Sequence, residues 1–580
     1  MLPLQQPLAA SPDACFWFSG RLDNGEEFAV SRPPDTPDIS DASAAFAAYE
    51  HLGDRFVSRL NGDFALALVD HRRRTLTLAR DVMASEPLYY CPLPGLVLFA
   101  SEIKCLLAHP AVAAVPDEDG LAELVLDYWC DEHRTCFRGI YSVPPGHSIV
   151  ADAAGIRRRT DWTFDPSRQI RYRSFDDYRD QFASIFDQAV RRRLRCKQSV
   201  GVAVSGGLDS SSIFCQALVA CRAGSSRAKI RGISMTFPAG TPPDERSFLQ
   251  EIERMHDVSV ARVPVSEYSY VDYIGDAVRR LDTPGAAEGS ALRVFETARR
   301  AGCDVLLSGF FGDQMLSNRG YLVDLAKQGR WLKIRHDLHE VAAWNTDVDP
   351  LLFRIETRRR FVRGLPPRWL FRLVKRLLSD PRLSARYPVW FAAAFRQRAA
   401  VRSSARFAEP RRFASAHAEQ YYRHATAGHY RNIVRCERSA AAACGIDLRY
   451  PFRDRDLVAF LMAIPGEVVN WRGVPKALLR HAMDGILPPA VRDRRWKADF
   501  TALENSAMRR DAPHAVEWLN RDSLSVLAGF VEVSSVDRAA STFARMNDTE
   551  GASPGWRLTD LAGLELWLQH LQTFGSAHPR

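Results

Sequence analysis

The chain has 580 residues and a formal net charge of +9, with 46% hydrophobic, 25% charged and 10% aromatic residues. These globular values exclude a wholly disordered, collagen-like or coiled-coil protein, and no apolar stretch approaches the ~18 residues of a membrane-spanning helix. The charge is uneven, because residues 351–412 contain sixteen Arg and one Lys against three acids, which leaves −5 for the rest of the chain. A mildly acidic body with one basic insert argues against general nucleic-acid binding.

Residues 1–14 contain no basic residue ahead of their short apolar run, so we expect no secretory signal. The eleven cysteines are scattered and include no CxxC pair. This usage is typical of reduced thiols in a cytoplasm rather than of a disulfide framework. We therefore expect a cytoplasmic protein without a membrane span.

The first part of the chain, residues 1–165, is predicted to be a β-rich domain. Short apolar or alternating runs indicate strands at 64–69, 75–79, 96–100 and 148–151. Around residues 161–173 the sequence becomes polar and loses periodicity, and we place the domain linker there.

The second predicted domain spans residues 174–580. Apolar residues at spacings of three and four predict a helix after Ser174. Buried strands are expected at 199–204, 230–237 and 305–307, with helical stretches at 245–255 and 291–301 between them. Strands that alternate with helices indicate a doubly wound parallel sheet. From about residue 320 onwards the pattern is mostly helical.

The strongest local signal is the segment Ser205-Gly206-Gly207-Leu208-Asp209-Ser210 between a predicted strand and a predicted helix. Two glycines allow a ligand to approach the backbone closely, and the N–H groups at a helix N-terminus bind anions. The serines add hydroxyl donors, and Asp209 is suited to a metal ion that bridges phosphate oxygens. The segment is neither a Walker loop nor a GxGxxG turn.

This loop resembles the pyrophosphate loop of the ATP-pyrophosphatase family, whose members cleave ATP between the α- and β-phosphates and pass AMP to an acceptor. Further segments, in family order, resemble class B asparagine synthetases. They are Leu60-Asn-Gly-Asp-Phe-Ala65, Arg80-Asp81, Pro87-Leu-Tyr-Tyr90, Phe99-Ala-Ser-Glu-Ile-Lys104, Leu307-Ser-Gly-Phe-Phe-Gly-Asp313, Gly445-Ile-Asp-Leu-Arg-Tyr-Pro-Phe-Arg-Asp454 and Arg494-Arg-Trp-Lys-Ala-Asp-Phe500. The resemblance implies an N-terminal glutamine-hydrolase-like (Ntn-type) sandwich and a C-terminal ATP-pyrophosphatase domain that uses ATP and Mg²⁺.

The N-terminal half departs from a working glutaminase of the family, which begins Met-Cys-Gly and uses that Cys as its nucleophile. Here the sequence reads Met1-Leu2-Pro3, and Cys15 stands just before the predicted strand 16–19. The family's Asn-Gly-Glu, which holds the glutamine amide, corresponds to Ser19-Gly20-Arg21. We expect a domain that keeps its fold and is inactive towards glutamine.

The nitrogen must then come from free ammonia or from an amine on the substrate. β-Lactam synthetases and lasso-peptide cyclases of this family use an internal amine that attacks an acyl-adenylate. Phe310, Phe311 and Gln314 stand where asparagine synthetases carry Glu, Gly and Glu, and Phe310 lacks the hydroxyl of the Tyr–Glu pair of β-lactam synthetases. A peptide whose fold presents its amine needs less machinery, because proximity does much of the work.

The resemblance also implies roles for single residues. Lys497 would stabilise charge in the transition state, and Asp313 would join Asp209 as the second Mg²⁺ ligand. Asp447 would orient the amine or Lys497, or pair with Arg449; Asp244, Glu245 and Asp282 would lie near the nucleotide or cap helices. The nucleotide site would comprise Val204, Ser205, Gly206, Gly207, Asp209, Ser210, Met235, Ser308 and Gly309.

The sequence is therefore identified as a member of the lasso-peptide cyclase branch, in which an Asp or Glu side chain of a precursor is adenylated and the N-terminal amine of the core closes an isopeptide ring. Such a function in antibiotic biosynthesis implies a precursor peptide, a leader peptidase and a leader-recognition protein, and no nucleic acid. The alternatives are a small-molecule ligase, either ammonia-dependent asparagine synthetase or β-lactam synthetase, and a nucleotide-binding scaffold. The basic helical insert at about 320–430 is interpreted as a docking surface or as a solvated helical face.

Overall fold

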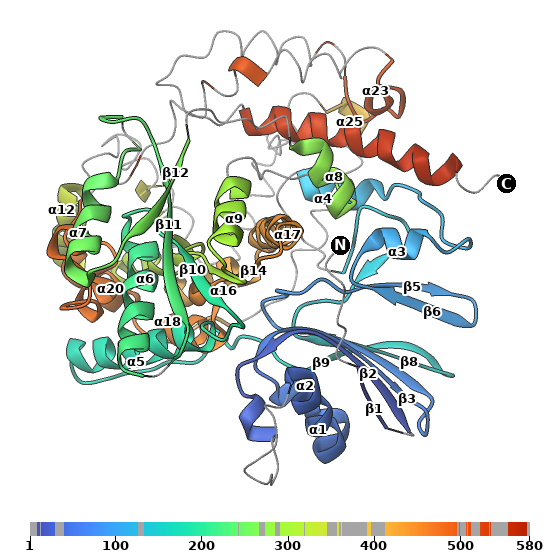
Figure 1. The fold of residues 1–580 in the computed structure, drawn as a ribbon, viewed down its shortest axis with the longest axis horizontal. Coiled ribbons are helices and arrows are strands. Elements are labelled where there is room, and N and C mark those ends of the chain that lie inside the picture. Colours follow the sequence, from blue (N-terminus) through green and yellow to red (C-terminus); the bar gives the residue numbers. More distant parts are fainter. Residues whose placement is uncertain are drawn as a thin grey trace.

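The computed structural model shows a β-rich N-terminal part and an α/β C-terminal part (Figure 1). It describes residues 8–11, 13–28, 40–125, 133–224, 226–241, 243–265, 273–284, 291–317, 319–344, 357–358, 361, 391–395, 412–495, 498, 506, 509–511, 522–532, 534 and 555–576. Nearly all of the basic stretch 351–412, and the amphipathic patterns predicted in it, lie outside these residues.

Two antiparallel sheets form the N-terminal part. Their strand orders are β1-β2-β3-β4-β8-β9 and β6-β5-β7. The strands are β1 (Leu8–Ser11), β2 (Ala14–Leu22), β3 (Gly62–Asp70), β4 (Thr75–Arg80), β5 (Tyr89–Leu93), β6 (Leu96–Ala100), β7 (Tyr141–Ser142), β8 (His147–Asp152) and β9 (Gly155–Thr160). All four strands predicted here from apolar patterns are present. Cys15, expected just before a strand, lies inside β2 because that strand begins at Ala14.

Each face of the larger sheet has its own apolar cover. On one face, Phe16 and Phe64 pack against Phe46 of helix α1 (Asp41–Leu52). On the other, Ala67 and Leu78 pack against Tyr90 of the smaller sheet. Alternation of side chains along β3 allows one strand to supply both cores.

The C-terminal part is built on a five-stranded sheet in the order β12-β11-β10-β13-β14, with all neighbouring strands parallel. The strands are β10 (Ser199–Ala203), β11 (Lys229–Thr236), β12 (Val260–Pro264), β13 (Val305–Leu307) and β14 (Asp447–Arg449). The chain moves outward from β10 to β12 and then returns to the other side of β10, as in a doubly wound sheet. Sequence patterns predicted β10, β11 and β13. They did not predict β12, whose apolar run is interrupted by Arg262, or β14, whose sequence Asp-Leu-Arg has a charged residue at each end in place of an apolar run.

Helices cover both faces of this sheet. Phe186 of α5 (Phe175–Arg192) and Phe214 of α6 (Leu208–Arg222) pack in one cluster with Val202 of β10. On the other face, α9 (Ala291–Arg300) and α17 (Gly428–Ala443) pack against β11 and β13. Helix α5 begins at a capping box that Ser174 and Asp177 form, which explains why the predicted helix starts there.

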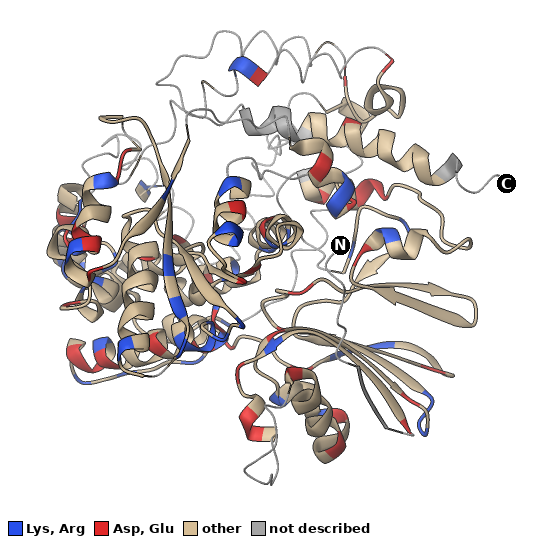
Figure 2. Ribbon diagram, in the orientation of Figure 1, with Lys and Arg blue, Asp and Glu red and all other residues tan. Residues whose placement is uncertain are grey.

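Further helices complete the described fold. They are α2 (Phe56–Arg59), α3 (Ile103–Leu107), α4 (Glu118–Val125), α7 (Arg246–His256), α8 (Ile274–Leu281), α10 (Gly312–Leu316), α11 (Tyr321–Lys327), α12 (Trp331–Trp344), α16 (Ala416–Thr426), α18 (Arg455–Ala463), α19 (Gly466–Val469), α20 (Ala477–Ala482), α21 (Pro489–Arg492), α23 (Leu524–Leu527) and α25 (Gly555–Ser576). In the parts of the chain that the structure describes, no helix is long and apolar enough to cross a membrane. Figure 2 shows charges of both signs scattered along the described helices, such as α5.

The two parts share apolar cores. Met83 and Phe164 of the N-terminal part belong to the same cluster as Phe186 and Phe452 of the C-terminal part. At a second contact, Trp567 of α25 packs edge-on against Phe137, with ring centroids 5.4 Å apart. Figure 1 shows α25 running along α8 and past α4. The two domains are thus joined through continuous apolar packing.

Candidate functional site

The candidate site lies where the order of the parallel sheet reverses. Strands β10 and β13 are neighbours, and the chain leaves them in opposite lateral directions. The loop after β10 carries the Ser205–Ser210 motif, and the loop after β13 carries Ser308–Asp313. Ligands of doubly wound sheets bind at such a switch point, outside the carboxyl ends of the strands.

The first loop is shaped for an anion. Gly206 adopts a φ of 83°, which favours glycine, and the 15-residue helix α6 starts at Leu208. The Ser205 hydroxyl accepts a hydrogen bond from the N–H of Gly207 (3.2 Å) and lies 3.1 Å from the Ser210 hydroxyl. The helix begins inside the motif, so Asp209 stands on its first turn. The arrangement offers backbone N–H groups and a helix N-terminus to phosphate.

The second loop lies directly against the first. A Cβ placed on Gly312 would lie 2.6 Å from Cγ of Asp209, closer than real Cβ contacts allow. The N–H of Ser308 donates to the carbonyl of Arg449 in the β14 region (3.0 Å), and the Ser308 hydroxyl accepts from the N–H of Phe310 (3.2 Å). The other predicted nucleotide-site residues, buried Val204 and half-buried Met235, are at the carboxyl ends of β10 and β11.

Lys476 joins the two motifs, and sequence reasoning missed it. Its Nζ donates to Oδ2 of Asp209 (2.5 Å) and to Oδ1 of Asp313 (2.6 Å). Burial alone would lower the pKa of this ammonium, but the two carboxylates outweigh burial and raise the pKa above its usual value. Lys476 also has a φ of 57°, a strained conformation that bulky residues seldom adopt away from functional sites. Its sequence signal is weak, because a Lys 163 residues after Asp313 stands in no motif considered above.

The predicted metal ligands fit a divalent cation. Asp209 and Asp313 both reach a single cationic atom, so their oxygens can share one centre. Carboxylate oxygens are what Mg²⁺ prefers, and one or two of them with substrate phosphates commonly complete its shell. Among the described residues, no further His, Cys, Asp or Glu joins them to make a group of three. The pair therefore suits a metal whose remaining ligands come from a nucleotide and water.

Arg494 also contacts the first loop. Its Nη1 donates to the carbonyl of Gly206 (3.2 Å) and pairs with Glu245, and its guanidinium lies 4.5 Å from the ring centroid of Phe248. Glu245 is thus tied to the nucleotide loop. Asp244 pairs with the Arg246 side chain and accepts a hydrogen bond from the N–H of Arg246 (3.3 Å), the first residue of α7, as expected of a residue that caps a helix. Lys497, the predicted catalytic residue, lies outside the described residues.

Aromatic rings surround the second loop. The ring of Phe310 lies 5.9 Å from that of Tyr450 and 6.3 Å from that of Tyr430, and the Phe311 ring lies 5.6 Å from Tyr430. Phe311 is 1% exposed and has a φ of 79°, a conformation that suits the glycine found there in asparagine synthetases. Aromatic side chains therefore stand beside the second loop at the positions where those enzymes carry a Glu and a Gly.

A Tyr–Glu pair lies behind Phe310, and sequence reasoning did not identify it. The hydroxyl of Tyr450 donates to Oε2 of Glu437 on α17 (2.7 Å). Burial is the largest cause that raises the pKa of Glu437, and burial followed by the Glu437 charge raises the pKa of Tyr450. A carboxylate with a raised pKa is a better proton acceptor near neutrality. The pair brings together residues thirteen apart, on different elements, which no local motif encodes.

Two other predicted residues have structural partners. Asp447 accepts a hydrogen bond from Nε of Arg449 (2.8 Å), which is the geometry of the predicted ion pair. Burial alone would raise the pKa of Asp447, but the charges of Arg449 and Arg438 outweigh burial and lower it. Asp282 ends helix α8 and accepts a hydrogen bond from the N–H of Lys104 (3.0 Å); burial raises its pKa to about 6. Asp282 thus connects the two parts of the molecule.

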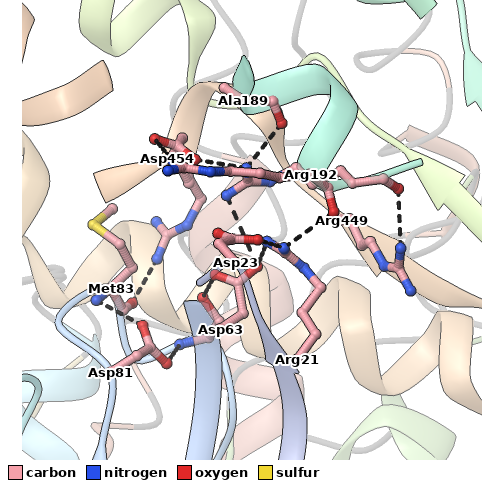
Figure 3. A network of polar contacts seen from close by, with 12 residues as sticks. Arg21, Asp23, Asp63, Asp81, Met83, Ala189, Arg192, Arg449 and Asp454 are labelled. Carbon is pink, nitrogen blue, oxygen red and sulfur yellow. Dashed lines mark hydrogen bonds and ion pairs between the residues drawn. The ribbon is translucent and has the colours of Figure 1, made fainter. Parts of the chain in front are cut away.

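Arg21 stands where the family has the Glu that binds glutamine. Its side chain is part of a buried network of hydrogen bonds and ion pairs (Figure 3). Its Nη2 donates to Asp63 (2.6 Å), and it also pairs with Asp23. Arg193 of the other part lies 3.9 Å from Asp63 and 2.9 Å from Asp454. Cys15 lies apart from this network, with its Sγ 3.6 Å from Nε2 of His71.

Comparison with known proteins gives the following. The model of the family described as asparagine synthase matches residues 181–569, and the model of the glutamine amidotransferase domain matches residues 5–163. Asparagine synthetase [glutamine-hydrolyzing] 3 of Bacillus subtilis is 25% identical over 89% of this chain and 78% of its own length. Amidase chyE of Penicillium rubens is 26% identical, and the chain spans only 42% of its length. Asparagine synthetase [glutamine-hydrolyzing] 2 of Arabidopsis thaliana is 32% identical over 31% of this chain and 26% of its own length.

Proposed function

Because the chain belongs to the asparagine synthase family, whose members are ATP-dependent, AMP-forming carbon–nitrogen ligases, we propose that it closes an isopeptide ring in a ribosomal precursor peptide. An Asp or Glu side chain of the peptide is adenylated, with release of pyrophosphate. The N-terminal amine of the core then attacks the acyl-adenylate and AMP leaves. The aromatic surround of Phe310 carries this proposal, because a phenyl ring, packed against Tyr430 and Tyr450, stands at the position where asparagine synthetases carry a carboxylate for aspartate and ammonia.

The phosphate end of the site supports adenylation. The Ser205–Ser210 loop and the α6 N-terminus bind the phosphates of ATP. Mg²⁺ held by Asp209 and Asp313 would neutralise charge on those phosphates. Lys476 shares these two carboxylates, so its ammonium is positioned to move onto the leaving pyrophosphate once a metal ion is bound. Lys497 stabilises charge in both transition states, as expected from its motif.

The acceptor end of the site supports attack by an amine. The attacking nitrogen forms a bond to the acyl carbon, the bond from that carbon to the AMP oxygen breaks, and the nitrogen loses one proton. We assign this proton to Glu437, whose raised pKa suits a base and whose carboxylate Tyr450 orients (2.7 Å). Asp447, paired with Arg449, is a positioning residue for this strand end.

The proposal extends to partners. A leader peptidase frees the amine, a leader-recognition protein delivers the precursor, and the basic stretch 351–412 docks one of them through its charge. We place the reaction in the cytoplasm, because the ten described cysteines are all free. The N-terminal domain is proposed to be inactive towards glutamine, since Arg21 is engaged with Asp63 where the amide would be held.

The test uses a leader-trimmed core peptide with one internal Asp or Glu, ATP and Mg²⁺. We expect AMP, pyrophosphate and a peptide lighter by one water, and little turnover with aspartate plus ammonia. Oxygen-18 in the peptide carboxylate should appear in AMP, which identifies the adenylate. Lys497→Ala and Glu437→Gln should lower kcat while ATP still binds. Glu296→Gln, at an exposed position on α9, is the matched control and should be unchanged. Formation of ADP, or robust asparagine synthesis, would refute the proposal.

One observation favours a second candidate, a small-molecule ligase that closes a lactam. β-Lactam synthetases use a Tyr–Glu pair, and Tyr450 with Glu437 supplies such a pair although Phe310 lacks a hydroxyl. The two candidates differ in the acceptor. Turnover with short N-carboxyalkyl β-amino acids, and none with core peptides, would select the small-molecule ligase.

A further inference from the structure

Arg480 of α20 joins two backbone segments that lie beside the nucleotide loops. Its Nε donates to the carbonyl of Pro475 (2.9 Å), the residue before Lys476. Its Nη1 and Nη2 donate to the carbonyls of Arg492 and Arg494, the latter at 3.1 Å. Arg480 therefore connects the turn that carries Lys476 with the segment that carries Arg494.

A guanidinium is suited to this position because its donors are held in one plane. Three nitrogen atoms of Arg480 donate to three different carbonyls, so the side chain fixes the separation of the two segments. Burial lowers the pKa of Arg480 to about 10, and the charges of Asp493 and Asp209 partly offset this effect. The group is thus still a cation at neutral pH, and its hydrogen bonds are charge-assisted.

The ring of Trp344, at the end of α12, supports Arg480. The guanidinium carbon of Arg480 lies 4.6 Å from the ring centroid, and that of Arg495 lies 5.1 Å from it. Such cation–π contacts are strongest with Trp. Helix α12 also packs closely on the turn before Lys476, because a Cβ placed on Gly473 would lie 2.8 Å from the Cα of Asp337. Helices α12 and α20 and the segment 492–495 are therefore packed together.

This packed group contacts the phosphate loop through Arg494. The buried Arg494 side chain donates to the carbonyl of Gly206 (3.2 Å) and pairs with Glu245. Gly206 has a φ of 83°, and the N–H groups that follow it are those offered to phosphate. Because Arg480 holds the backbone carbonyl of Arg494, it fixes the point from which the Arg494 side chain reaches this loop.

We propose that Arg480 is a positioning residue for the phosphates of ATP and that Trp344 supports it in this role. Arg480 acts through Arg494 and Lys476 rather than by contact with the nucleotide. It holds Arg494 against Gly206, and it holds the turn from which Lys476 reaches Asp209 and Asp313. This role requires only nucleotide binding, and it is the same whichever acceptor the ligase uses.

Equilibrium dialysis of the full chain with labelled ATP and Mg²⁺, and separately with labelled adenosine, tests this role. Arg480→Met should weaken ATP binding about tenfold, the effect of losing one charge-assisted hydrogen bond. Adenosine has no phosphate, so its affinity should not change. Arg480→Lys should weaken ATP binding as much as Arg480→Met, because an ammonium cannot reach three separate carbonyls. Trp344→Leu should weaken it about threefold.

Arg455→Met is the matched control. Arg455 of α18 also lies over a tryptophan, 5.0 Å from the ring centroid of Trp162, and it also donates to a backbone carbonyl, that of Leu60 (3.1 Å). This variant should have a lower melting temperature, as Arg480→Met should, but an unchanged affinity for ATP. If Arg480→Met fails to fold, as judged by circular dichroism, Arg480→Lys and Trp344→Leu decide the matter.

Three results would overturn the proposal: wild-type affinity for ATP in Arg480→Met or Arg480→Lys, an equal loss of ATP and adenosine binding, or a loss of ATP binding in Arg455→Met. A wild type that binds no ATP would overturn it together with the nucleotide site. The measurement uses no peptide, so a failure of peptide cyclisation leaves its outcome unaffected.

Discussion

Replacing Lys476 with Met tests whether the ammonium stands in for a metal ion. The variant keeps the length of the side chain and leaves Asp209 and Asp313 facing a shared centre without a cation. Loss of one partner of a buried ion pair costs about 3–5 kcal/mol. Lys476 and Asp209 are largely buried, with side chains 13% and 15% exposed, but Asp313 is 44% exposed and its pair adds at most about 1 kcal/mol after solvent screening. Because neither group is fully buried, we expect a loss of about 3 kcal/mol.

Mg²⁺ should reverse most of this loss. A cation at 100 times its dissociation constant stabilises the folded state by about 2.7 kcal/mol. Scanning fluorimetry without nucleotide should therefore show a lower melting temperature for Lys476→Met, and a larger increase with Mg²⁺ than the wild type shows, since no ammonium competes for the carboxylates.

A matched control is Lys333→Met, because Lys333 also lies between two carboxylates, Asp337 (3.2 Å) and Glu467 (3.8 Å), away from the nucleotide motifs. This variant should lose stability, and Mg²⁺ without nucleotide should raise its melting temperature no more than that of the wild type. If Mg²⁺ stabilises the wild type and Lys476→Met equally, the two aspartates do not form the metal site and the reasoning fails.

Two further predictions concern the packing around the site. Gly312→Ala places a methyl group 2.6 Å from Cγ of Asp209 and should abolish the stabilisation by ATP with Mg²⁺ in scanning fluorimetry. Gly275→Ala, in which the nearest contact of the new methyl group would be 3.6 Å, should behave as the wild type. Normal nucleotide binding by Gly312→Ala would contradict the close contact between the two loops. Burial lowers the pKa of His417 to about 4, so the unfolded chain, with a His pKa near 6.5, takes up the proton first as the pH falls. The free energy of unfolding should therefore decrease by about 2 kcal/mol between pH 7 and pH 5. In urea unfolding, the free energy of unfolding of His417→Asn should depend less steeply on pH than that of the wild type. An equally steep dependence would exclude this histidine as the cause.

The parts of the site that the sequence could reveal are those encoded by neighbouring residues. The Ser205–Ser210 loop follows a β-branched run, and such a strand, turn and helix can be seen in one short window. Ser308–Asp313 could be placed beside it because parallel strands bring their carboxyl ends to one edge. Lys476, Glu437 and Tyr450 could not be found in this way, since their partners stand on other elements and only packing brings them together.

The same distinction holds for the fold. Alternation and helical periods predicted the strands of β3, β4 and β10 and the start of α5. Strand β14, Asp-Leu-Arg, has no apolar run, and its place in the sheet follows from pairing with β13. Arg21 stands where the family has a Glu, and this difference predicted the loss of glutamine binding. Only the structure shows that Arg21 pairs with Asp63.

The shared core has a consequence for anyone who recombines these domains. Arg453 is buried and donates to the backbone carbonyl of Met83 (2.6 Å), while Met83 and Phe164 contribute to the same apolar cluster as Phe452. A C-terminal domain expressed alone would present an arginine without its acceptor beside uncovered apolar side chains. The two domains therefore depend on each other for folding. A protein whose first domain has lost its catalytic function still needs that domain, and a chimera has to exchange both sides of the domain interface together.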